Sequence, residues 1–342
     1  MKDINAPLFI EVKQDDNGQR LDRWLKKNVP GLSYVLVQKL LRKGQIRIDG
    51  KRAKPETRIQ TGQEIKIPPV AQQEDLASKK TTKPYKITDK DRSFMRSLVL
   101  YEDEWVIALN KPHDLAVQGG TKTKRHIDGM LEVFKNKEGV VPRLVHRLDK
   151  ETSGVLLLAR SAKVARILGK TFKNRDIRKV YWAIVSPVPE LYEGIIKAPI
   201  LKSGGDYEKM ELDDEDGKSA ITEYAVIENA ASEAAFIAFW PHTGRTHQIR
   251  VHASKVLGCP ILGDRKYKAE KDEESKRIDA NLSGLDIAKR LHLHARRLIL
   301  PHPAHPARTL DITAPLCPDL VRSWKALGFN HKYKHDPFDT LD

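Results

Sequence analysis

From residue 97 onward, the sequence carries short apolar runs with the length and spacing of β-strands: SLVLYEDEWVIALNKP, GVLLLA, KVYWAIVS, AITEYAVIE, AAFIAFW and RRLILPHP. Helical patterns separate some of these runs at irregular intervals. One begins at Ser161, and another begins near Thr246, carries Val256 inward and ends at Gly258. Runs of strands with irregularly placed helices favour an α+β domain on a mixed, largely antiparallel sheet over a doubly wound fold.

A separate small α/β domain precedes these strands. One amphipathic helix begins near Gln19 and stops before Pro30, and a second ends at Gly44. The short strands QIRID and EIKIPP follow, with a turn at Asp49-Gly50. The predicted boundaries are 13–70 for the small domain, 71–95 for a polar linker, 96–330 for the large domain and 331–342 for a C-terminal tail.

Positive charge is concentrated in the small domain. The chain has a formal net charge of +15, and residues 13–70 hold 14 Lys and Arg against 6 Asp and Glu, which is a net charge of +8. Strongly basic proteins usually bind a polyanion, most often nucleic acid. The basic side chains lie off the apolar stripes of the helices; they include Arg23, Lys26, Lys27, Lys39, Arg42, Lys43, Arg47, Lys51 and Arg52.

Several classes of protein are disfavoured by what the sequence lacks. No apolar run reaches roughly 18 residues, and the first residues do not resemble a secretory signal, so no membrane association and a cytoplasmic location are predicted. Cys259 and Cys317 form neither a disulfide framework nor a zinc motif. No glycine-rich phosphate loop is present, and His247 and His252 lack the spacing of a helical metal site. Neither a cofactor nor a metal is predicted.

One carboxylate stands out in HRLDKETSG, where Asp149 lies between Arg147 and Lys150, directly before the apolar run VLLLA. An isolated aspartate of this kind is most often a cap or turn residue. Two further stretches accompany it, RKVYWAIV and TGRTHQIRVHASKVLGCPILGD. An ionised carboxylate beside apolar walls needs a nearby cation to offset its desolvation.

These three stretches resemble the motifs of RNA pseudouridine synthases of the family that acts on ribosomal and transfer RNA, and the resemblance extends from residue 97 to about 329. RLDRWLKKNVPGLSYVLVQKLLRKGQIRIDGKRAKP resembles the S4 RNA-binding domain. The combination is similar to synthases that modify large-subunit ribosomal RNA, most closely the C subgroup. The sequence departs from the family at VQGG and in the long charged segment 266–290.

The resemblance implies a role for each motif residue. Asp149 would be the catalytic carboxylate, with Arg250 as its cationic partner, and Arg147 would fill the space left by the flipped base. Tyr181 would stack on the uracil and help remove its C5 proton, and Ile249 would wall the pocket. Arg245 and His247 are expected to support the turn. The S4-like domain would hold RNA phosphates through the side chains of Arg23, Lys39, Arg42, Lys43 and Arg47.

The expected activity is therefore isomerisation of specific uridines in 23S (large-subunit) ribosomal RNA, before or during assembly, by a monomer. Breaking the N1–C1′ bond leaves an electron-poor sugar that one carboxylate can stabilise, and no cofactor is needed. Whether the carboxylate attacks C1′ or removes a C2′ proton stays open. The alternatives are a noncatalytic RNA-binding or assembly factor, which would have lost Asp149, Tyr181 or Arg250, and a metal-dependent RNA hydrolase.

Overall fold

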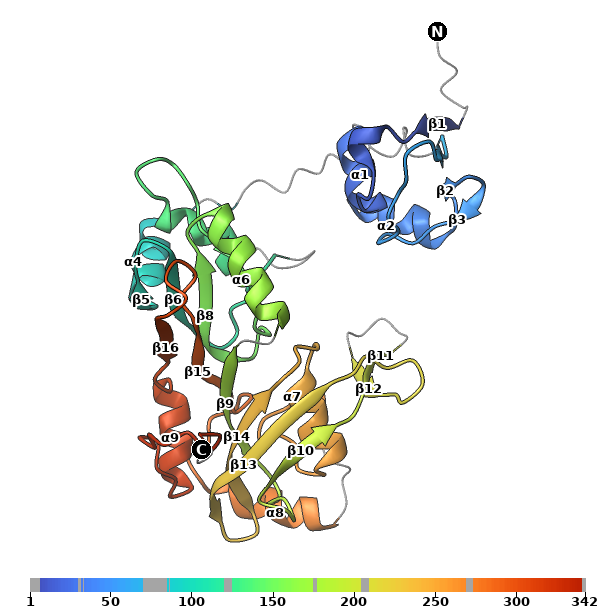
Figure 1. The fold of residues 1–342 in the computed structure, drawn as a ribbon. Coiled ribbons are helices and arrows are strands. Elements are labelled where there is room, and N and C mark those ends of the chain that lie inside the picture. Colours follow the sequence, from blue (N-terminus) through green and yellow to red (C-terminus); the bar gives the residue numbers. More distant parts are fainter. Residues whose placement is uncertain are drawn as a thin grey trace. The chain divides into compact units, whose positions relative to one another are not determined.

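The structure is a computed structural model in which the chain forms two compact units, residues 1–84 and residues 85–342. Each unit has its own sheet and its own apolar core, and each is described by itself (Figure 1). The described residues are 7–29, 32, 34–69, 85, 87–119, 125–174, 177–203, 209–268 and 273–339.

The small unit packs two helices against a four-stranded antiparallel sheet with the strand order β1-β4-β2-β3. Its core includes Trp24 and Leu25 of the first helix and Val37 and Leu40 of the second, which confirms the helical faces expected from the sequence. Strand β1 precedes the predicted start at residue 13 and extends the domain. The elements are β1 (Leu8–Glu11), η1 (Gln14–Asp16), α1 (Leu21–Asn28), α2 (Tyr34–Arg42), β2 (Arg47–Ile48), β3 (Lys51–Arg52) and β4 (Glu64–Ile67).

Helix α4 (Asp89–Ser97) corrects the predicted linker 71–95, of which residues 71–84 and 86 lie outside the described residues. Thr88 and Asp91 form a capping box at its N-terminus, and the fully buried Met95 anchors it to the large core. Hydrogen bonds from Thr88 hold the pKa of Asp91 well below its usual range. Since a helix this polar shows little apolar periodicity, its sequence is easily mistaken for a linker.

A ten-stranded mixed sheet is the centre of the large unit, and it confirms the predicted α+β class (Figure 1). Its path is β10-β13-β14-β9-β15-β8-β6-β5, with β16 paired to β15 and β7 to β8. Among the described strands, β8 and β15 form the one parallel pair. The strands are β5 (Val99–Glu102), β6 (Val106–Lys111), β7 (Arg143–Leu144), β8 (Ser153–Ala159), β9 (Arg178–Val185), β10 (Glu193–Lys197), β13 (Ile221–Ala230), β14 (Ala234–Pro241), β15 (Leu293–Pro301) and β16 (Thr309–Thr313), with β11 (Ile200–Lys202) and β12 (Met210–Leu212) in a separate hairpin.

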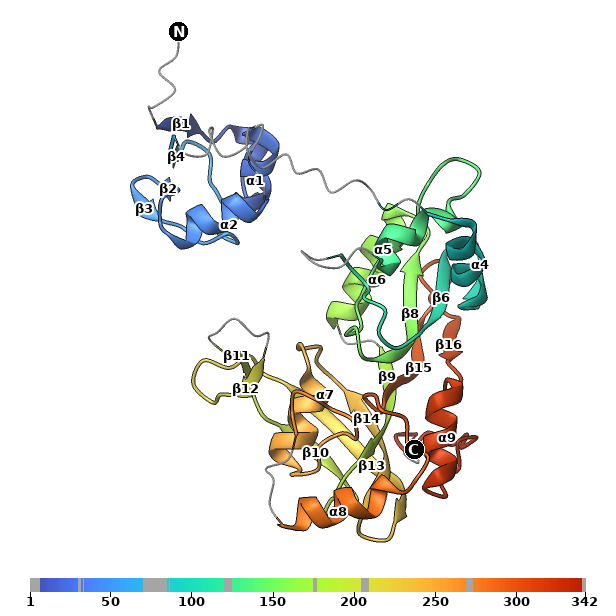
Figure 2. The ribbon, with the colours of Figure 1, turned by 180° about the vertical axis from the view of Figure 1, so that it is seen from behind.

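Helices cover both faces of this sheet (Figure 2). Along β8 the side chains alternate, so that Leu156 and Leu158 contact the α4 side while Val155 and Leu157 contact α6. Around β9, Trp182 packs on the α9 side and Ala183 on the side of α7. The helices are α5 (Ile127–Met130), η2 (Leu131–Phe134), α6 (Ala162–Asn174), α7 (Gln248–Val251) with the π-turn η3 (His252–Val256), α8 (Glu273–Ser283) and α9 (Pro318–Ala326).

Two outer segments that are polar in sequence form ordered structure on the large unit. The tail predicted over 331–342 packs on the domain as far as it is described: Phe338 is buried near α9, and Asp336 accepts hydrogen bonds from Arg178 and Arg297. The charged segment 266–290 contains helix α8, with residues 269–272 outside the described part of the chain. Both segments are polar in sequence, and a few apolar side chains and ion pairs are enough to attach them.

Candidate active site

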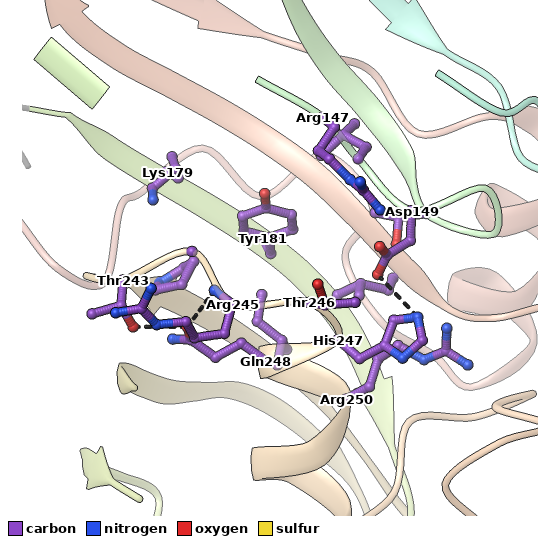
Figure 3. Close-up of a pocket in the computed structure, with 16 residues that line it drawn as sticks. Arg147, Asp149, Lys179, Tyr181, Thr243, Arg245, Thr246, His247, Gln248 and Arg250 are labelled. Carbon is purple, nitrogen blue, oxygen red and sulfur yellow. Dashed lines mark hydrogen bonds and ion pairs between the residues drawn. The ribbon is translucent and has the colours of Figure 1, made fainter. Parts of the chain in front are cut away.

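A cavity of about 200 Å³ opens where the loop before β8, strand β9, the end of β14 and helix α7 meet. Arg147, Asp149, Tyr181, Ile249 and Arg250 all line it, although they come from three separate motifs (Figure 3). The structure therefore brings together every candidate residue predicted in the large domain. The five candidates in the small domain, Arg23, Lys39, Arg42, Lys43 and Arg47, are all exposed on their own unit.

Asp149 is held in place by the turn that leads into β8. The Thr152 amide donates to the Asp149 carbonyl at 3.1 Å, and Gly154 then takes a φ of +113°. A Cβ on Gly154 would lie 2.2 Å from the Ala295 carbonyl oxygen, so only glycine permits this approach to β15. The TSG end of the motif thus has a structural role: it fixes the carboxylate relative to the sheet.

The histidine of HRLD has a structural role. His146 Nε2 accepts a hydrogen bond from the Leu157 amide at 2.8 Å, and its ring stacks on Phe172. Burial lowers the pKa of His146 to about 3, so the ring is neutral and can act as an acceptor at physiological pH. The bond ties the start of the motif to β8.

Lys111 is a buried cation beside the same loop that the sequence did not identify as a site residue. Its Nζ donates to the carbonyl oxygens of Pro112, Leu115 and Lys150, at 2.9, 2.9 and 3.1 Å. Burial lowers the pKa of Lys111 to about 7. Because Lys150 follows Asp149, this amine fixes the backbone next to the carboxylate. The NKP turn at the end of β6 was the available signal.

The partner of Arg250 differs from the prediction. Arg250 is almost fully buried and binds Asp264 through two hydrogen bonds, of 2.7 and 2.6 Å, and Glu151 at 3.0 Å. A direct ion pair between Arg250 and Asp149 is absent from the structure, in which both residues are described. Asp264, fixed by its own turn, offers the planar two-oxygen geometry that a guanidinium prefers.

His247 is the side chain whose position sequence reasoning missed most. It adopts a left-handed backbone conformation with a φ of +54° at the start of α7. Its Nε2 lies 3.9 Å from Asp149 Oδ2 (Figure 3). Its Nδ1 lies 2.8 Å from the Tyr267 hydroxyl. The sequence interpretation gave it a role in the turn, and the structure places it beside the carboxylate as well.

Tyr181, Ile249 and Arg147 complete the cavity. Burial, with a smaller contribution from Asp149, raises the pKa of Tyr181, so its hydroxyl keeps its proton near neutral pH. Ile249 is buried in a cluster that Tyr181 joins. Arg147 is exposed, and its side chain has no hydrogen-bond or ion-pair partner among the described residues. The cavity therefore has an apolar wall, one phenol and a cation at its rim.

Within the described residues, no group of three or more His, Cys, Asp or Glu side chains has the arrangement of a metal site. None of the helices in that part of the chain is long and apolar enough to cross a membrane.

Comparison with known proteins identifies the family. Residues 105–255 match the RNA pseudouridylate synthase family, and residues 19–65 match the S4 domain. A protein of Rickettsia bellii named ribosomal large subunit pseudouridine synthase C is 36% identical over 304 residues, which cover 87% of this chain and 91% of that protein. The chain belongs to the RNA pseudouridine synthase family.

Other members support the same assignment. A synthase C of Pasteurella multocida is 33% identical over 94% of each chain. RNA pseudouridine synthase 4, mitochondrial, of Arabidopsis thaliana is 34% identical over 86% of this chain and 73% of its own. The solved human RNA Pseudouridylate Synthase Domain Containing 4 superposes with a TM-score of 0.58 at 30% identity, covering 70% of this chain and 98% of that one. This pseudouridine synthase, with its S4 domain, isomerises uridine to pseudouridine in RNA.

Proposed function

We propose that this synthase modifies specific uridines of large-subunit (23S) ribosomal RNA, with Asp149 as its single catalytic carboxylate. The observation that carries the proposal is the position of Asp149 in a cavity of about 200 Å³ that Tyr181 also lines. This volume is below the roughly 300–1,000 Å³ of sites for drug-sized ligands and suits a single base.

The reaction needs no atoms beyond those of the substrate. The N1–C1′ bond breaks, the uracil turns, its C5 bonds to C1′, and the C5 proton leaves while N1 gains one. Asp149 stabilises the electron-poor sugar, either by bonding to C1′ or by taking a C2′ proton. Arg250 supplies positive charge near this carboxylate through a rigid frame, since Asp264 and Glu151 hold its guanidinium.

Tyr181 and Arg147 handle the base. The Tyr181 ring offers a surface on which uracil stacks, and its protonated hydroxyl takes part in proton transfer at C5. A base inside folded RNA must leave its stack to reach the cavity, and unstacking costs a few kcal/mol. Arg147, exposed at the rim, fills the gap that the flipped base leaves.

The substrate assignment rests on the relatives and on charge. Synthases C of Rickettsia bellii and Pasteurella multocida carry ribosomal large subunit in their names. The small domain, with its net charge of +8 over residues 13–70, supplies phosphate contacts that offset the cost of flipping. A base buried in a finished subunit is out of reach, so modification takes place before or during assembly.

The test is the substitution Asp149→Asn, which keeps the shape of the side chain and removes its charge. Tritium release from 23S RNA carrying [5-³H]uridine should be lost, while RNA affinity and thermal stability stay near the wild-type values. Asp114→Asn is the matched control, because Asp114 is an exposed aspartate of the same unit that pairs with Lys150 outside the cavity. Multiple turnover by the Asp149→Asn protein would overturn the assignment.

A further inference from the structure

A continuous series of polar atoms runs from hairpin β11–β12 to the carboxylate of Asp149. The Met210 amide of β12 donates to the Tyr267 hydroxyl oxygen at 2.9 Å. That oxygen lies 2.8 Å from His247 Nδ1, and His247 Nε2 lies 3.9 Å from Asp149 Oδ2. Four segments that are distant in sequence thus contribute one atom or ring each.

The donors and acceptors in these side chains favour one direction of hydrogen bonding along the series. The Tyr267 oxygen accepts from the Met210 amide, which leaves its own proton to donate to His247 Nδ1. A neutral imidazole that accepts at Nδ1 carries its proton on Nε2. In that tautomer, the N–H of His247 faces Asp149. Burial, the largest influence, lowers the pKa of His247, which keeps the ring neutral at pH 7.

The surrounding packing holds both rings in place. Tyr267 is fully buried, and its ring meets the His247 ring edge-on at 5.6 Å. Its backbone amide is bound by Asp264, the residue that also grips Arg250, and the Arg250 guanidinium lies over its ring at 5.4 Å. The left-handed backbone at His247 points the imidazole between the tyrosine and the carboxylate.

We infer that His247 is a positioning residue for this reaction: as the Nε2–H tautomer set by Tyr267, it donates to Asp149 Oδ2 and leaves Oδ1 for the sugar. The inference rests on the proposed role of Asp149. Within the described residues no hydrogen bond reaches Oδ1. The separation of 3.9 Å is longer than a hydrogen bond, and we expect it to shorten when substrate binds, because catalytic hydrogen bonds tighten in the substrate complex.

A neutral donor suits this position better than a second cation would. Several charged side chains already face His247 and Asp149. A hydrogen bond donated by a neutral imidazole favours the ionised carboxylate without forming a tight ion pair. The charged side chains near His247 are Arg250, Lys266 and Asp264. Lys111 lies near Asp149, and Glu151 lies near Arg250.

Activity measurements on His247 variants test the donor. Asn tolerates the left-handed backbone and places an oxygen near Nδ1 for Tyr267, but it has no group at the position of Nε2. His247→Asn should lower kcat about 10- to 100-fold with little change in KM, because a hydrogen bond to a charged group is lost. The acid limb of its rate profile should move to higher pH. His247→Gln, whose amide reaches the Nε2 position, should recover part of the rate.

Nitrogen-15 NMR of histidine-labelled full-length protein tests the tautomer without any RNA. His247, assigned by loss of its signals in His247→Asn, should show Nε2–H at pH 7, and Tyr267→Phe should produce a tautomer mixture. An Nδ1–H or doubly protonated ring in the wild type would overturn the inference, as would wild-type kcat and pH profile in a folded His247→Asn protein.

The two proposals can fail separately. A fully active His247→Asn protein beside an inactive Asp149→Asn protein removes the role of the histidine and leaves Asp149 as the catalytic carboxylate. An active Asp149→Asn protein removes the proposed function, whatever tautomer NMR reports.

Discussion

The two units of this chain place their basic side chains differently. In the small unit, the core cluster consists of aliphatic side chains and Trp24. Basic side chains of both helices and of the hairpin are exposed, namely Arg23, Lys26, Lys39, Arg42, Arg47, Lys51 and Arg52. In the large unit, Lys111, Arg250 and Arg290 are buried with their partners. All 12 histidines lie in the large unit, and several of them are buried.

Exposed cations are suited to binding a partner, whereas buried charged groups hold neighbouring side chains in fixed positions. Exposed cations act on a partner through solvent, so salt screens them and their number matters more than their exact geometry. Buried cations and histidines act on fixed neighbours in a low dielectric, so salt has little effect and loss of one partner is costly.

Removal of the small unit should have the largest effect. A protein comprising residues 85–342 should bind a 23S RNA fragment on the order of 10³-fold more weakly at low salt, because phosphate contacts dominate affinity. Its plot of log K against log salt concentration should also be shallower, by about 0.7–0.9 for each lost phosphate contact. Equal slopes for the full-length and shortened proteins would mean that the phosphate contacts lie in the large unit.

Loss of a buried partner should be the next largest effect. Asp264→Asn leaves the Arg250 guanidinium poorly paired, and the free energy of unfolding of the large unit should fall by about 3–5 kcal/mol in urea denaturation. Arg47→Gln is the matched change in the small unit, where an exposed guanidinium binds the carbonyls of Gly44 and Gly50. It should cost less than about 1 kcal/mol. Similar costs for the two variants would erase the contrast between the units.

As the pH falls, the large unit should lose stability before the small unit does. Burial lowers the pKa values of His146 and His294 to about 3 and that of His292 to about 4. Their folded pKa values lie below the unfolded value of about 6.5, so the unfolded chain binds more protons at acid pH. The stability they contribute is complete above pH 6.5 and falls below it, by on the order of 1 kcal/mol per histidine at pH 5.5.

Scanning calorimetry of the full-length protein from pH 7.5 to 5 measures this effect. The transition of the large unit should move to lower temperature across that range. The small unit has no histidine, so its transition should stay in place until carboxylates titrate near pH 4. Parallel movement of both transitions would contradict the assignment.

The smallest effect tests the attachment of helix α4. Thr88→Ala removes the cap that receives the Asp91 amide, and it should lower the free energy of unfolding of the large unit by about 1 kcal/mol. Thr88→Ser keeps the hydroxyl and should stay close to the wild type. A loss as large for serine as for alanine would show that the methyl group, and not the cap, matters there.

Sequence patterns predicted the parts of this molecule that repeat with a simple period. The faces of α1, α2 and α6 follow from apolar spacing alone, and the continuous apolar run of β8 indicated a buried strand. The three motifs identified Asp149, Tyr181 and Arg250 as neighbours, and all three line the cavity. The spacing of apolar residues indicates which face of a helix or strand is buried. It does not determine which side chains form ion pairs in the folded protein.

The errors have physical causes at particular residues. The predicted helix through Gly258 placed Val256 inward, but a π-turn at His252–Val256 changes the register, and Val256 is 43% exposed. The left-handed conformation of His247 has no signature in composition, so its place beside Asp149 was not visible. Asp264 lies 14 residues beyond Arg250, and only the tertiary turn brings them together.

The parallel pairing of β8 with β15 also sets an order of events during synthesis. Gly154 of β8 contacts Ala295 of β15, so the turn that carries Asp149 cannot be completed until about 140 further residues have left the ribosome. The small unit needs only its own first 84 residues. A nascent chain therefore gains its RNA-binding unit while its chemistry is still unformed, and uridine isomerisation begins only when β15 pairs with β8.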